Sequence, residues 1–394
     1  MSQRASDRRD SSRRPDRPGA GAMIGSFEVV VVGLGAIGSQ TLAALASRGI
    51  SAIGIDRYAP PHDRGSSHGR SRLIRFAYFE HPDYVPLVRR AMQLWSELER
   101  ATGRSLFVRT GLLQSGPPDS PLIAGIEASA AMHGLEIERP DRRETEGRFP
   151  VVIPEGWPIL FEQDAGYLLP ELAIEAALSV ARIHGATLLT DCPVRQAVRR
   201  GGGWRVTTDR GELQAERLVL TVGPWTGAWH ALGPSPPTIL RKHLFWYGCR
   251  DDRWLVRSAA PSFLFDTGSA YLYGMPNGDG SGVKIARHDG GVEVAPDDDD
   301  RRIGRDDEQR DADEFARRFL TGLSPAPIAH EICRYSMSPD GDFRLGDRDD
   351  GRVVWVSGLS GHGFKFATAL GEQVAMRIET GAWHPSVRFL TARD

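Results

Sequence analysis

The chain has 394 residues, of which 40% are hydrophobic and 25% charged, and its formal net charge is −2 at pH 7. This length is enough for two domains or one large composite domain. The near-neutral charge argues against a protein that binds nucleic acid through a basic face, and no apolar run approaches the roughly 20 residues that span a bilayer. We therefore expect neither a nucleic-acid nor a membrane partner.

The cysteines and the N-terminal segment indicate the environment of the chain. Cys192, Cys249 and Cys333 are far apart, and their odd number and spacing form neither a disulfide framework nor a metal site. We therefore expect a cytoplasmic protein without a bound metal. Residues 1–22 are polar and rich in Arg and Asp, a composition that predicts a disordered tail.

The predicted fold begins with a strand, a glycine-rich turn, a helix and a second strand. Residues 27–32 (FEVVVV) are an apolar run interrupted only by Glu28, which is typical of a parallel strand buried on both faces. The helix that follows the turn is expected to end near Gly49. Residues 53–55 start the second strand, which closes at Asp56.

Gly33, Gly35 and Gly38 form a Gly-x-Gly-x-x-Gly motif in this first turn. The first glycine permits a tight turn, the second lets backbone approach a pyrophosphate, and the third lets helix and strand pack closely. The helix N-terminus then favours a phosphate, and Asp56 is placed to accept a hydrogen bond from a ribose hydroxyl. The motif predicts dinucleotide binding, against a purely structural turn, and does not separate NAD from FAD.

Periodicity and turn residues predict the remaining elements. Further helices are predicted at residues 84–102, 170–183, 306–323 and 367–379. Further strands are predicted at residues 106–113, in a hairpin that turns at 201–203, before Gly223, and at 240–249, 269–275 and 353–356. The acidic run at residues 297–300 is interpreted as a solvated loop without functional weight.

Strand–turn–helix units at both ends and a sheet-rich middle predict a mixed α/β (α+β) protein. In this interpretation, a Rossmann-like nucleotide-binding domain is assembled from discontinuous segments, and an antiparallel-sheet substrate domain is inserted between them. The nucleotide-binding segments are residues 23–107, 165–232 and 331–390. The substrate-domain segments are residues 108–164 and 233–330.

Only three of the 49 basic residues are Lys, and these are Lys242, Lys284 and Lys365. Lys is a compact point charge with a movable pKa, so Arg does not replace it everywhere. Lys365 precedes the C-terminal helix, where the helix dipole opposes a cation. We expect a substrate carboxylate to compensate it there, with an exposed surface Lys as the alternative. No role is assigned to Lys242.

A second glycine-rich loop, residues 65–72, carries His68 and Arg72 and is followed by Arg75. Arg72 and Arg75 would share a face if the loop ends in a helical turn, although an ordinary exposed basic loop has the same local pattern. Cys333 is by itself either a small buried apolar residue or a thiol whose pKa is lowered by basic neighbours.

Together these segments resemble the monomeric sarcosine oxidase and N-methyltryptophan oxidase family, flavoenzymes that oxidise secondary amino acids. The resemblance runs in order from about residue 27 to 380. The stretches that carry it are RLIRFAY (72–78), FEQDAGYLLPE (161–171), LTVGPWT (220–226), AYLYGMP (270–276), GVKIARHDGG (282–291), CRY (333–335) and SGHGFK (360–365). The resemblance implies FAD, whereas an NAD dehydrogenase would leave Cys333 and SGHGFK unexplained.

The resemblance also implies a role for each matching residue. Cys333 would attach FAD covalently through sulfur, Lys284 would activate O2, and Arg75 with Lys365 would bind the substrate carboxylate. The residues implied around the flavin and the amine are His68, Arg72, Tyr273, His288 and Tyr335. The residues implied in FAD binding are Gly33, Gly35, Ala36, Ile37, Gly38, Asp56, Arg57, Ser66, Ser71, Arg72, Val194, Gly223, Trp225, Cys333, Gly361, His362, Gly363 and Lys365.

The implied activity is oxidation of a secondary N-methyl or N-alkyl amino acid, with hydride transfer to FAD, an imine product, and O2 reduced to H2O2. The alternatives are an oxidase of a cyclic imino acid, a glycated amino acid or a secondary-metabolite amine, a flavin dehydrogenase that uses an electron carrier, and a nucleotide-binding module without turnover. One departure is Arg70, which stands where the family has Asp and reverses a charge near the flavin. We expect a monomer, with a homodimer as the alternative.

Overall fold

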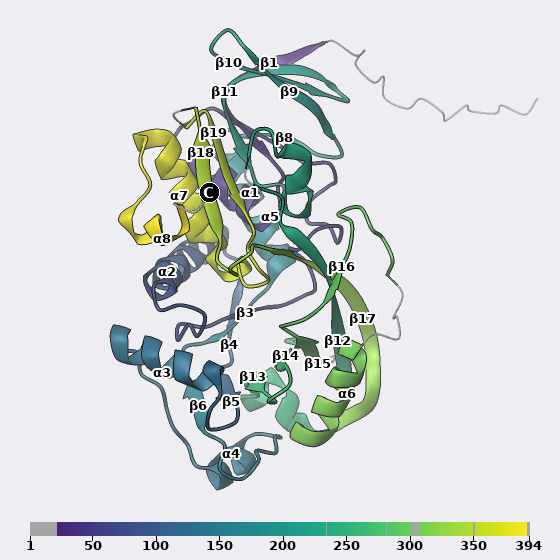
Figure 1. Ribbon diagram of the computed structural model, residues 1–394. Coiled ribbons are helices and arrows are strands. Elements are labelled where there is room, and N and C mark those ends of the chain that lie inside the picture. The colour runs from purple at the N-terminus through teal and green to yellow at the C-terminus, as the bar shows by residue number, and fades with distance from the viewer. Residues whose placement is uncertain (1–21, 234, 281, 302–306, 350, 392–394) are drawn as a thin grey trace, which may run out of the picture.

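The computed structural model describes residues 22–391 except 234, 281, 302–306 and 350. The tail predicted for residues 1–22 lies, apart from Ala22, outside the described residues. The described chain forms two main sheets at opposite ends of an elongated molecule, as Figure 1 shows. Among the described residues, no helix has the length and apolar character needed to cross a membrane.

The first sheet has eight strands and contains the predicted glycine motif. Its central order is β18-β19-β11-β1-β2-β8, and β10 and β9 extend it beside β11. The pairs within the run β19-β11-β1-β2-β8 are all parallel. The outer pairs are antiparallel: β18 with β19, β10 with β11, and β9 with β10. The bounds are β1 Met23–Val32, β2 Ala52–Ile55, β8 Thr187–Leu189, β9 Val194–Arg200, β10 Gly203–Thr208, β11 Gly211–Leu220, β18 Arg344–Arg348 and β19 Val353–Ser357.

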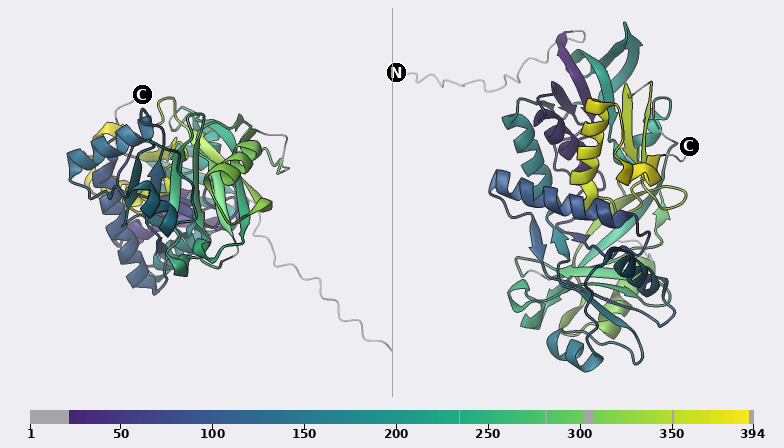
Figure 2. Two further views of the ribbon diagram at one scale, coloured as in Figure 1. Left: turned by 90° about the horizontal axis from the view of Figure 1, so that it is seen from below. Right: turned by 90° about the vertical axis from the view of Figure 1, so that its left-hand side faces the viewer.

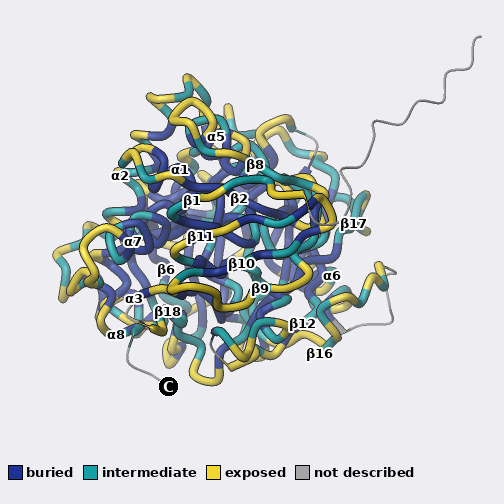
Figure 3. The backbone as a smooth tube through the Cα atoms, turned by 90° about the horizontal axis from the view of Figure 1, so that it is seen from above, coloured by how far each residue is buried: buried dark blue, intermediate teal, exposed yellow. Residues whose placement is uncertain are grey.

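Helices α1 (Ala36–Ala46), α2 (Tyr84–Thr102), α5 (Pro170–Ile183) and α7 (Ala367–Thr380) pack together beside this sheet. Their buried faces join one side of β1, β11 and β19 in a single hydrophobic core. The predicted helices at 84–102, 170–183 and 367–379 are confirmed, and α2 ends at Gly103, whose φ is +65°. Figure 2 shows α2 lying across the middle of the molecule, and Figure 3 shows the buried segments concentrated at its centre.

The second sheet has the order β16-β12-β15-β14-β13-β5-β6, with β17 also paired to β12. Its pairs are antiparallel except β5 with β13, which is parallel. The bounds are β5 Leu112–Ser115, β6 Ile159–Glu162, β12 Thr238–Cys249, β13 Ser262–Asp266, β14 Tyr271–Pro276, β15 Val283–Arg287, β16 Val292–Glu293 and β17 Leu323–Met337. The predicted mixed α/β fold class is therefore confirmed.

A small antiparallel sheet links the two main sheets. It contains β3 (Arg72–Ile74), β7 (Gly166–Leu168) and β4 (Phe107–Arg109). The predicted strand at 106–113 is therefore two strands, β4 and β5, in different sheets. The segment boundary predicted at residue 331 falls inside β17, which pairs with β12 from Leu323 to Met337.

The predicted helix at residues 306–323 is wrong at its end, and residue 306 lies outside the described residues. Helix α6 spans Asp307–Phe319. The chain then pairs with residues 150–152, because Val152 N donates to Phe319 O (2.8 Å) and Thr321 N donates to Pro150 O (2.9 Å). These contacts, together with a positive φ of 72° at Gly322, turn the chain into β17. Helices α3 (Pro121–His133), α4 (Arg142–Arg148) and α8 (Arg388–Thr391) were not predicted.

Candidate active site

A cavity of about 410 Å³ lies at the carboxyl ends of the parallel strands in the first sheet. Val32, Ile55, Thr221 and Val356, which stand at or just after the ends of these strands, line its floor. This is where open parallel sheets bind ligands, and the volume lies within the usual range of roughly 300 to 1,000 Å³ for ligand sites. We call this space the larger cavity.

The glycine motif builds one wall of the larger cavity from backbone. A Cβ atom on Gly33, whose φ is +89°, would stand 2.6 Å from Thr221 O, and one on Gly38 would collide with Gly33 O. The Asp56 carboxylate accepts a hydrogen bond from Leu34 N at 2.6 Å, so it supports the turn as well as lining the cavity. These residues leave bare backbone facing the cavity, as a pyrophosphate requires.

A second, smaller cavity of about 50 Å³ adjoins the larger one. Both cavities are lined by Arg72, Tyr335, Gly361 and Phe364, so these residues form their common wall. The smaller cavity therefore lies directly beside the larger cavity, on the side facing the second sheet.

Cys333 on β17 lines the smaller cavity and is buried. Its Sγ accepts a hydrogen bond from Arg72 Nη2 at 3.4 Å and donates to Ser66 O at 3.7 Å. Ser66 and Arg72 both line the larger cavity. The sulfur therefore lies at the junction of the two cavities.

Arg75 and Lys365 bring two cations to the smaller cavity. Arg75 Nη2 donates to both carboxylate oxygens of Glu80 at 2.7 Å, and Lys365 Nζ donates to His362 O at 2.8 Å. Burial, with Arg75 nearby, lowers the pKa of Lys365 to about 7. Burial alone would raise the pKa of Glu80, but Arg75 and the other basic groups around it lower this pKa to about 2. The Arg75 guanidinium is thus already paired with an ionised Glu80 carboxylate.

Apart from the Arg72 guanidinium on the common wall, the remaining polar wall of the smaller cavity consists of imidazole and phenol side chains that carry no charge. Burial lowers the pKa of His288 to about 4 and that of His362 to about 3, so both imidazoles are neutral near pH 7. The Tyr273 and Tyr335 hydroxyls lie 3.5 Å apart, and burial raises both of their pKa values. A neutral amine fits this environment better than an ammonium ion.

Lys284 is fully buried and lines neither cavity. Its Nζ donates to Gly69 O and Ser71 O, both at 2.9 Å, and lies 5.7 Å from the Trp246 ring centroid. Burial and the neighbouring Arg72 lower its pKa well below the usual value. The backbone of the second glycine-rich loop therefore holds Lys284 Nζ.

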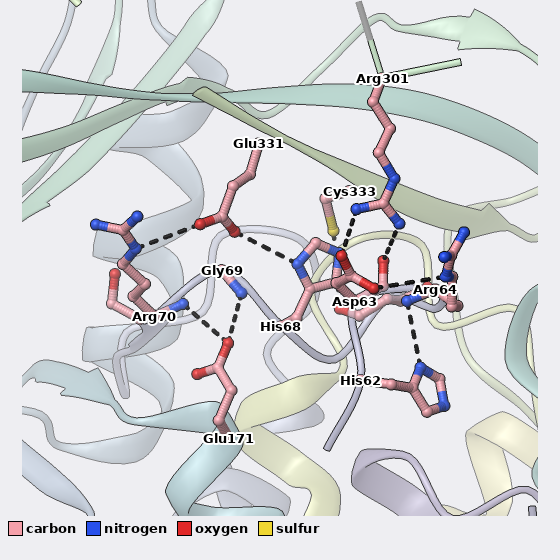
Figure 4. A network of polar contacts seen from close by, with 12 residues as sticks. His62, Asp63, Arg64, His68, Gly69, Arg70, Glu171, Arg301, Glu331 and Cys333 are labelled. Atoms are coloured by element: carbon pink, nitrogen blue, oxygen red, sulfur yellow. Dashed lines mark hydrogen bonds and ion pairs between the residues drawn. The ribbon is translucent and has the colours of Figure 1, made fainter. Parts of the chain in front are cut away.

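Figure 4 shows how charged side chains hold that loop from outside. Glu171 accepts hydrogen bonds from Gly69 N (2.8 Å) and Arg70 N (3.2 Å). Arg70 Nε pairs with Glu331 at 3.3 Å, and His68 Nδ1 lies 3.6 Å from the same carboxylate. Arg70 also lies over Trp246, 4.6 Å from its ring centroid, and lines neither cavity. The reversed charge at Arg70 is thus neutralised by Glu331.

The structure divides the predicted site residues into three groups. The predicted residues that line the larger cavity are Gly33, Gly35, Ala36, Ile37, Asp56, Arg57, Ser66, Arg72, Val194, Gly223, Trp225, Tyr335, Gly361 and Gly363. The predicted residues that line the smaller cavity are Arg72, Arg75, Tyr273, His288, Cys333, Tyr335, Gly361, His362 and Lys365. Gly38, His68, Ser71 and Lys284 lie behind these walls.

Sequence reasoning missed two acidic partners of the site. Asp297, in the acidic run interpreted as a plain solvated loop, lines the larger cavity. Its Oδ1 accepts hydrogen bonds from Arg57 Nη1 and Trp225 Nε1, both at 2.8 Å. Glu80 was also missed, and nothing local in the sequence distinguishes either residue from a surface acid.

Lys242, to which no role was assigned, is buried in an ion pair with Glu308. Its Nζ also donates to Asp289 O at 2.7 Å and lies 5.7 Å from the Tyr335 ring centroid. Burial lowers the pKa of Lys242, whereas Glu308 opposes that shift. Lys242 therefore ties β12 to helix α6 behind the smaller cavity.

The larger cavity at the carboxyl ends of a parallel sheet is of a kind that binds dinucleotides, and it adjoins a pocket lined by the cationic side chains of Arg72, Arg75 and Lys365. The chain belongs to the FAD dependent oxidoreductase family, whose model matches residues 28–377. The predicted enzyme class and flavin cofactor are thereby confirmed.

Among curated proteins, the chain is 35% identical over 354 residues to the N-methyl-L-tryptophan oxidase of Yersinia pestis, covering 89% of this chain and 94% of that protein. Its structure is similar to that of NikD, an amino acid oxidase essential for nikkomycin biosynthesis, with a TM-score of 0.82, 23% identity and coverage of 93% and 97%. It is also similar to the L-proline dehydrogenase from P. horikoshii, with a TM-score of 0.76, 21% identity and coverage of 94% and 96%. The two structural similarities concern the fold.

Proposed function

We propose that this enzyme is an oxidase of secondary amino acids that uses FAD linked covalently to Cys333 and O2 as the electron acceptor. The observation that carries the proposal is that Arg75, Lys365 and Cys333 line one small cavity, which shares a wall with the dinucleotide cavity. A substrate carboxylate held by the two cations would lie next to the sulfur proposed to attach the flavin. The similarity to an N-methyl-L-tryptophan oxidase supports an N-methyl or N-alkyl amino acid as substrate.

The residues around the larger cavity fit FAD. The bare backbone of Gly33 and Gly35 would hold the pyrophosphate, Asp56 and Arg57 the ribose side, and Val194 the adenine side. FAD supplies the redox chemistry: it accepts a hydride from a carbon next to the amine nitrogen and passes the electron pair to O2.

The chain's own residues would position the reacting groups. Arg75 and Lys365 would hold the carboxylate so that a C–H bond next to nitrogen faces the larger cavity. The carboxylate must replace Glu80 on Arg75 or bind beside that ion pair. Tyr273, His288 and Tyr335 would surround the amine with uncharged groups, which favours its neutral form. The substrate loses a hydride and a proton and leaves as an imine.

Lys284 is the proposed O2-activating residue. Its compact ammonium, held by two carbonyls of the flavin loop, would stabilise negative charge that develops on O2. Developing negative charge nearby also favours the protonated form of Lys284 against the effect of burial. O2 takes up two electrons and two protons and leaves as H2O2.

Two measurements test this function. The first is peroxide release with sarcosine, N-methyl-L-tryptophan, pipecolate and fructosyl-glycine, which separates N-methyl amino acids from the cyclic and glycated alternatives. Reduction of a dye without peroxide would instead indicate a dehydrogenase.

The second measurement is acid precipitation of the purified protein: a yellow pellet supports the Cys333 link, and release of all the FAD contradicts it. Cytoplasmic location and a monomeric state stay predictions.

A further inference from the structure

Glu162, at the end of β6, is a buried carboxylate outside both cavities. Its Oε1 accepts a hydrogen bond from Phe76 N at 2.5 Å, and its Oε2 accepts one from Ala77 N at 3.2 Å. One carboxyl group thus binds two successive peptide N–H groups that follow Arg75 in the chain.

This contact joins two parts of the molecule. Strand β6 belongs to the second main sheet, whereas Phe76 and Ala77 follow β3 in the small linking sheet. The chain leaves β6 at Glu162 and enters β7, which pairs with β3 through Ile74 and Gly166. Glu162 therefore anchors the segment after β3 to the second sheet at the point where that segment leaves the small sheet.

The segment that Glu162 holds is also the one that holds Arg75. Ala77 O accepts a hydrogen bond from Arg75 Nη1 at 3.1 Å. The Tyr78 and Phe79 ring centroids lie 4.3 and 4.6 Å from the Arg75 guanidinium carbon, and Glu80 forms the ion pair described above. Glu162 and Arg75 thus bind the N–H and the C=O of one residue, Ala77.

A merely space-filling residue would not need a charge here. Burying a carboxylate is unfavourable unless hydrogen bonds and nearby cations compensate it. Burial raises the pKa of Glu162 to about 7, while the two peptide N–H groups and Arg75 oppose that shift and Asp164 adds to it. A Gln side chain would offer one acceptor oxygen and would turn an NH2 group toward the other N–H donor.

We propose that Glu162 is a positioning residue that fixes the Phe76–Ala77 backbone and thereby orients Arg75 toward the substrate carboxylate. The inference rests on the proposed function in one respect, namely that Arg75 binds a carboxylate in the smaller cavity. Glu162 itself contacts neither cofactor nor substrate.

The test uses the flavin-loaded enzyme and acetate as a probe of carboxylate binding, followed by the change in flavin absorption. We expect E162Q to raise the dissociation constant of acetate and the KM of the amine substrate about tenfold, as for the loss of one hydrogen bond to a charged group. We expect kcat to change less than about twofold. E162Q should weaken the carboxylate contact equally in the substrate complex and in the transition state for hydride transfer, and such a uniform loss of binding raises KM without lowering kcat. An unchanged acetate affinity in E162Q would overturn the proposal.

Glu99 provides a matched control. Its Oε1 accepts hydrogen bonds from Leu106 N (2.6 Å) and Phe107 N (2.9 Å), and it lines neither cavity. Because one oxygen of Glu99 accepts both bonds, a Gln amide oxygen could still accept them, so the control variant is E99A. E99A removes this backbone anchor away from Arg75, so acetate affinity should stay at the wild-type value. An equal loss of affinity in E99A and E162Q would indicate general destabilisation and would overturn a specific role of Glu162.

A double-mutant cycle with R75K separates this inference from the proposed function. If Glu162 acts through Arg75, E162Q weakens acetate binding much less in an R75K background than in the wild type. Equal effects in both backgrounds overturn the inference. If R75K alone leaves acetate binding unchanged, the carboxylate role of Arg75 fails, and the inference fails with it.

Should E162Q not fold, E162D takes its place in the same cycle. E162D keeps the carboxylate on a shorter side chain, and the expected signs are the same.

Discussion

The two cavities are built in different ways. The larger cavity takes one wall, the proposed phosphate-binding wall, from one stretch of backbone, the turn between β1 and α1, where added side chains would collide with the fold. The smaller cavity is lined by side chains from segments near residues 72–79, 264–288, 333–335 and 361–365. A wall made of backbone depends on one short stretch of sequence, whereas a pocket made of side chains depends on the packing of distant strands.

The largest expected effect is on the backbone-built cavity. A Cβ atom at Gly38 would collide with Gly33 O, so we expect G38A to be purified without flavin or not to fold. Flavin content, measured by visible absorption, checks this. G147A is the control, because Gly147 has no positive φ and no atom lies within 4 Å of its added Cβ. Wild-type flavin content in G38A would show that the turn tolerates a side chain.

The next effect concerns Lys284, which lies behind the walls of the two cavities. We expect K284M to slow flavin reoxidation by O2 about 100-fold or more, as for the loss of one electrostatic stabiliser. Flavin reduction by substrate should change far less, because Lys284 does not line the smaller cavity. Stopped-flow measurement of the two half-reactions separates them. Reoxidation at the wild-type rate would refute the assignment.

The ion pair behind the smaller cavity should affect stability more than chemistry. K242M leaves the Glu308 carboxylate buried without its cation, which we expect to lower the free energy of unfolding by about 3 kcal/mol. Chemical denaturation measures this loss. K242M/E308L, which removes both charges, should recover most of it, and a double variant as unstable as K242M would contradict the explanation.

A moderate effect is expected from releasing Arg75. E80Q removes the carboxylate that pairs with Arg75, so acetate should bind about fivefold more tightly than in the wild type. Titration of the flavin-loaded enzyme with acetate measures this. The control is E97Q, because Glu97 is a half-exposed acid that lines neither cavity and pairs with Arg90. Weaker acetate binding in E80Q would mean that Glu80 orients Arg75 more than it blocks it.

The smallest effect is a pH dependence. Because the pKa of Lys365 is about 7 and a bound carboxylate favours its protonated form, acetate affinity should fall as the pH rises above 7. Glu80, His288 and His362, with pKa values of about 2, 4 and 3, do not titrate there. Glu162, with a pKa of about 7, does titrate there, and its ionisation should strengthen the anchor that orients Arg75; this raises acetate affinity and opposes the fall. K365M should therefore lose the fall in affinity; a fall of the same size in K365M would assign it to another group.

The sequence by itself determined the features that depend on neighbours in the chain. The glycine motif, the buried run of β1 and the apolar stripe of α2 predicted the first sheet and its helices, because strand alternation, helix periodicity and tight turns are short-range properties. The resemblance of several motifs in order then indicated the flavoenzyme class, which the family match confirmed.

Only the tertiary structure decided which charges meet. It placed Lys284 on carbonyls more than 200 residues earlier in the chain, Lys242 on Glu308, and Asp297 on Arg57. It also showed that α6 ends at Phe319, where pairing with residues 150–152 overrides helical periodicity. An ion pair or strand pairing between distant segments leaves no periodic signal in a single sequence, because the free energy that fixes it comes from burial and contacts formed only in the folded chain.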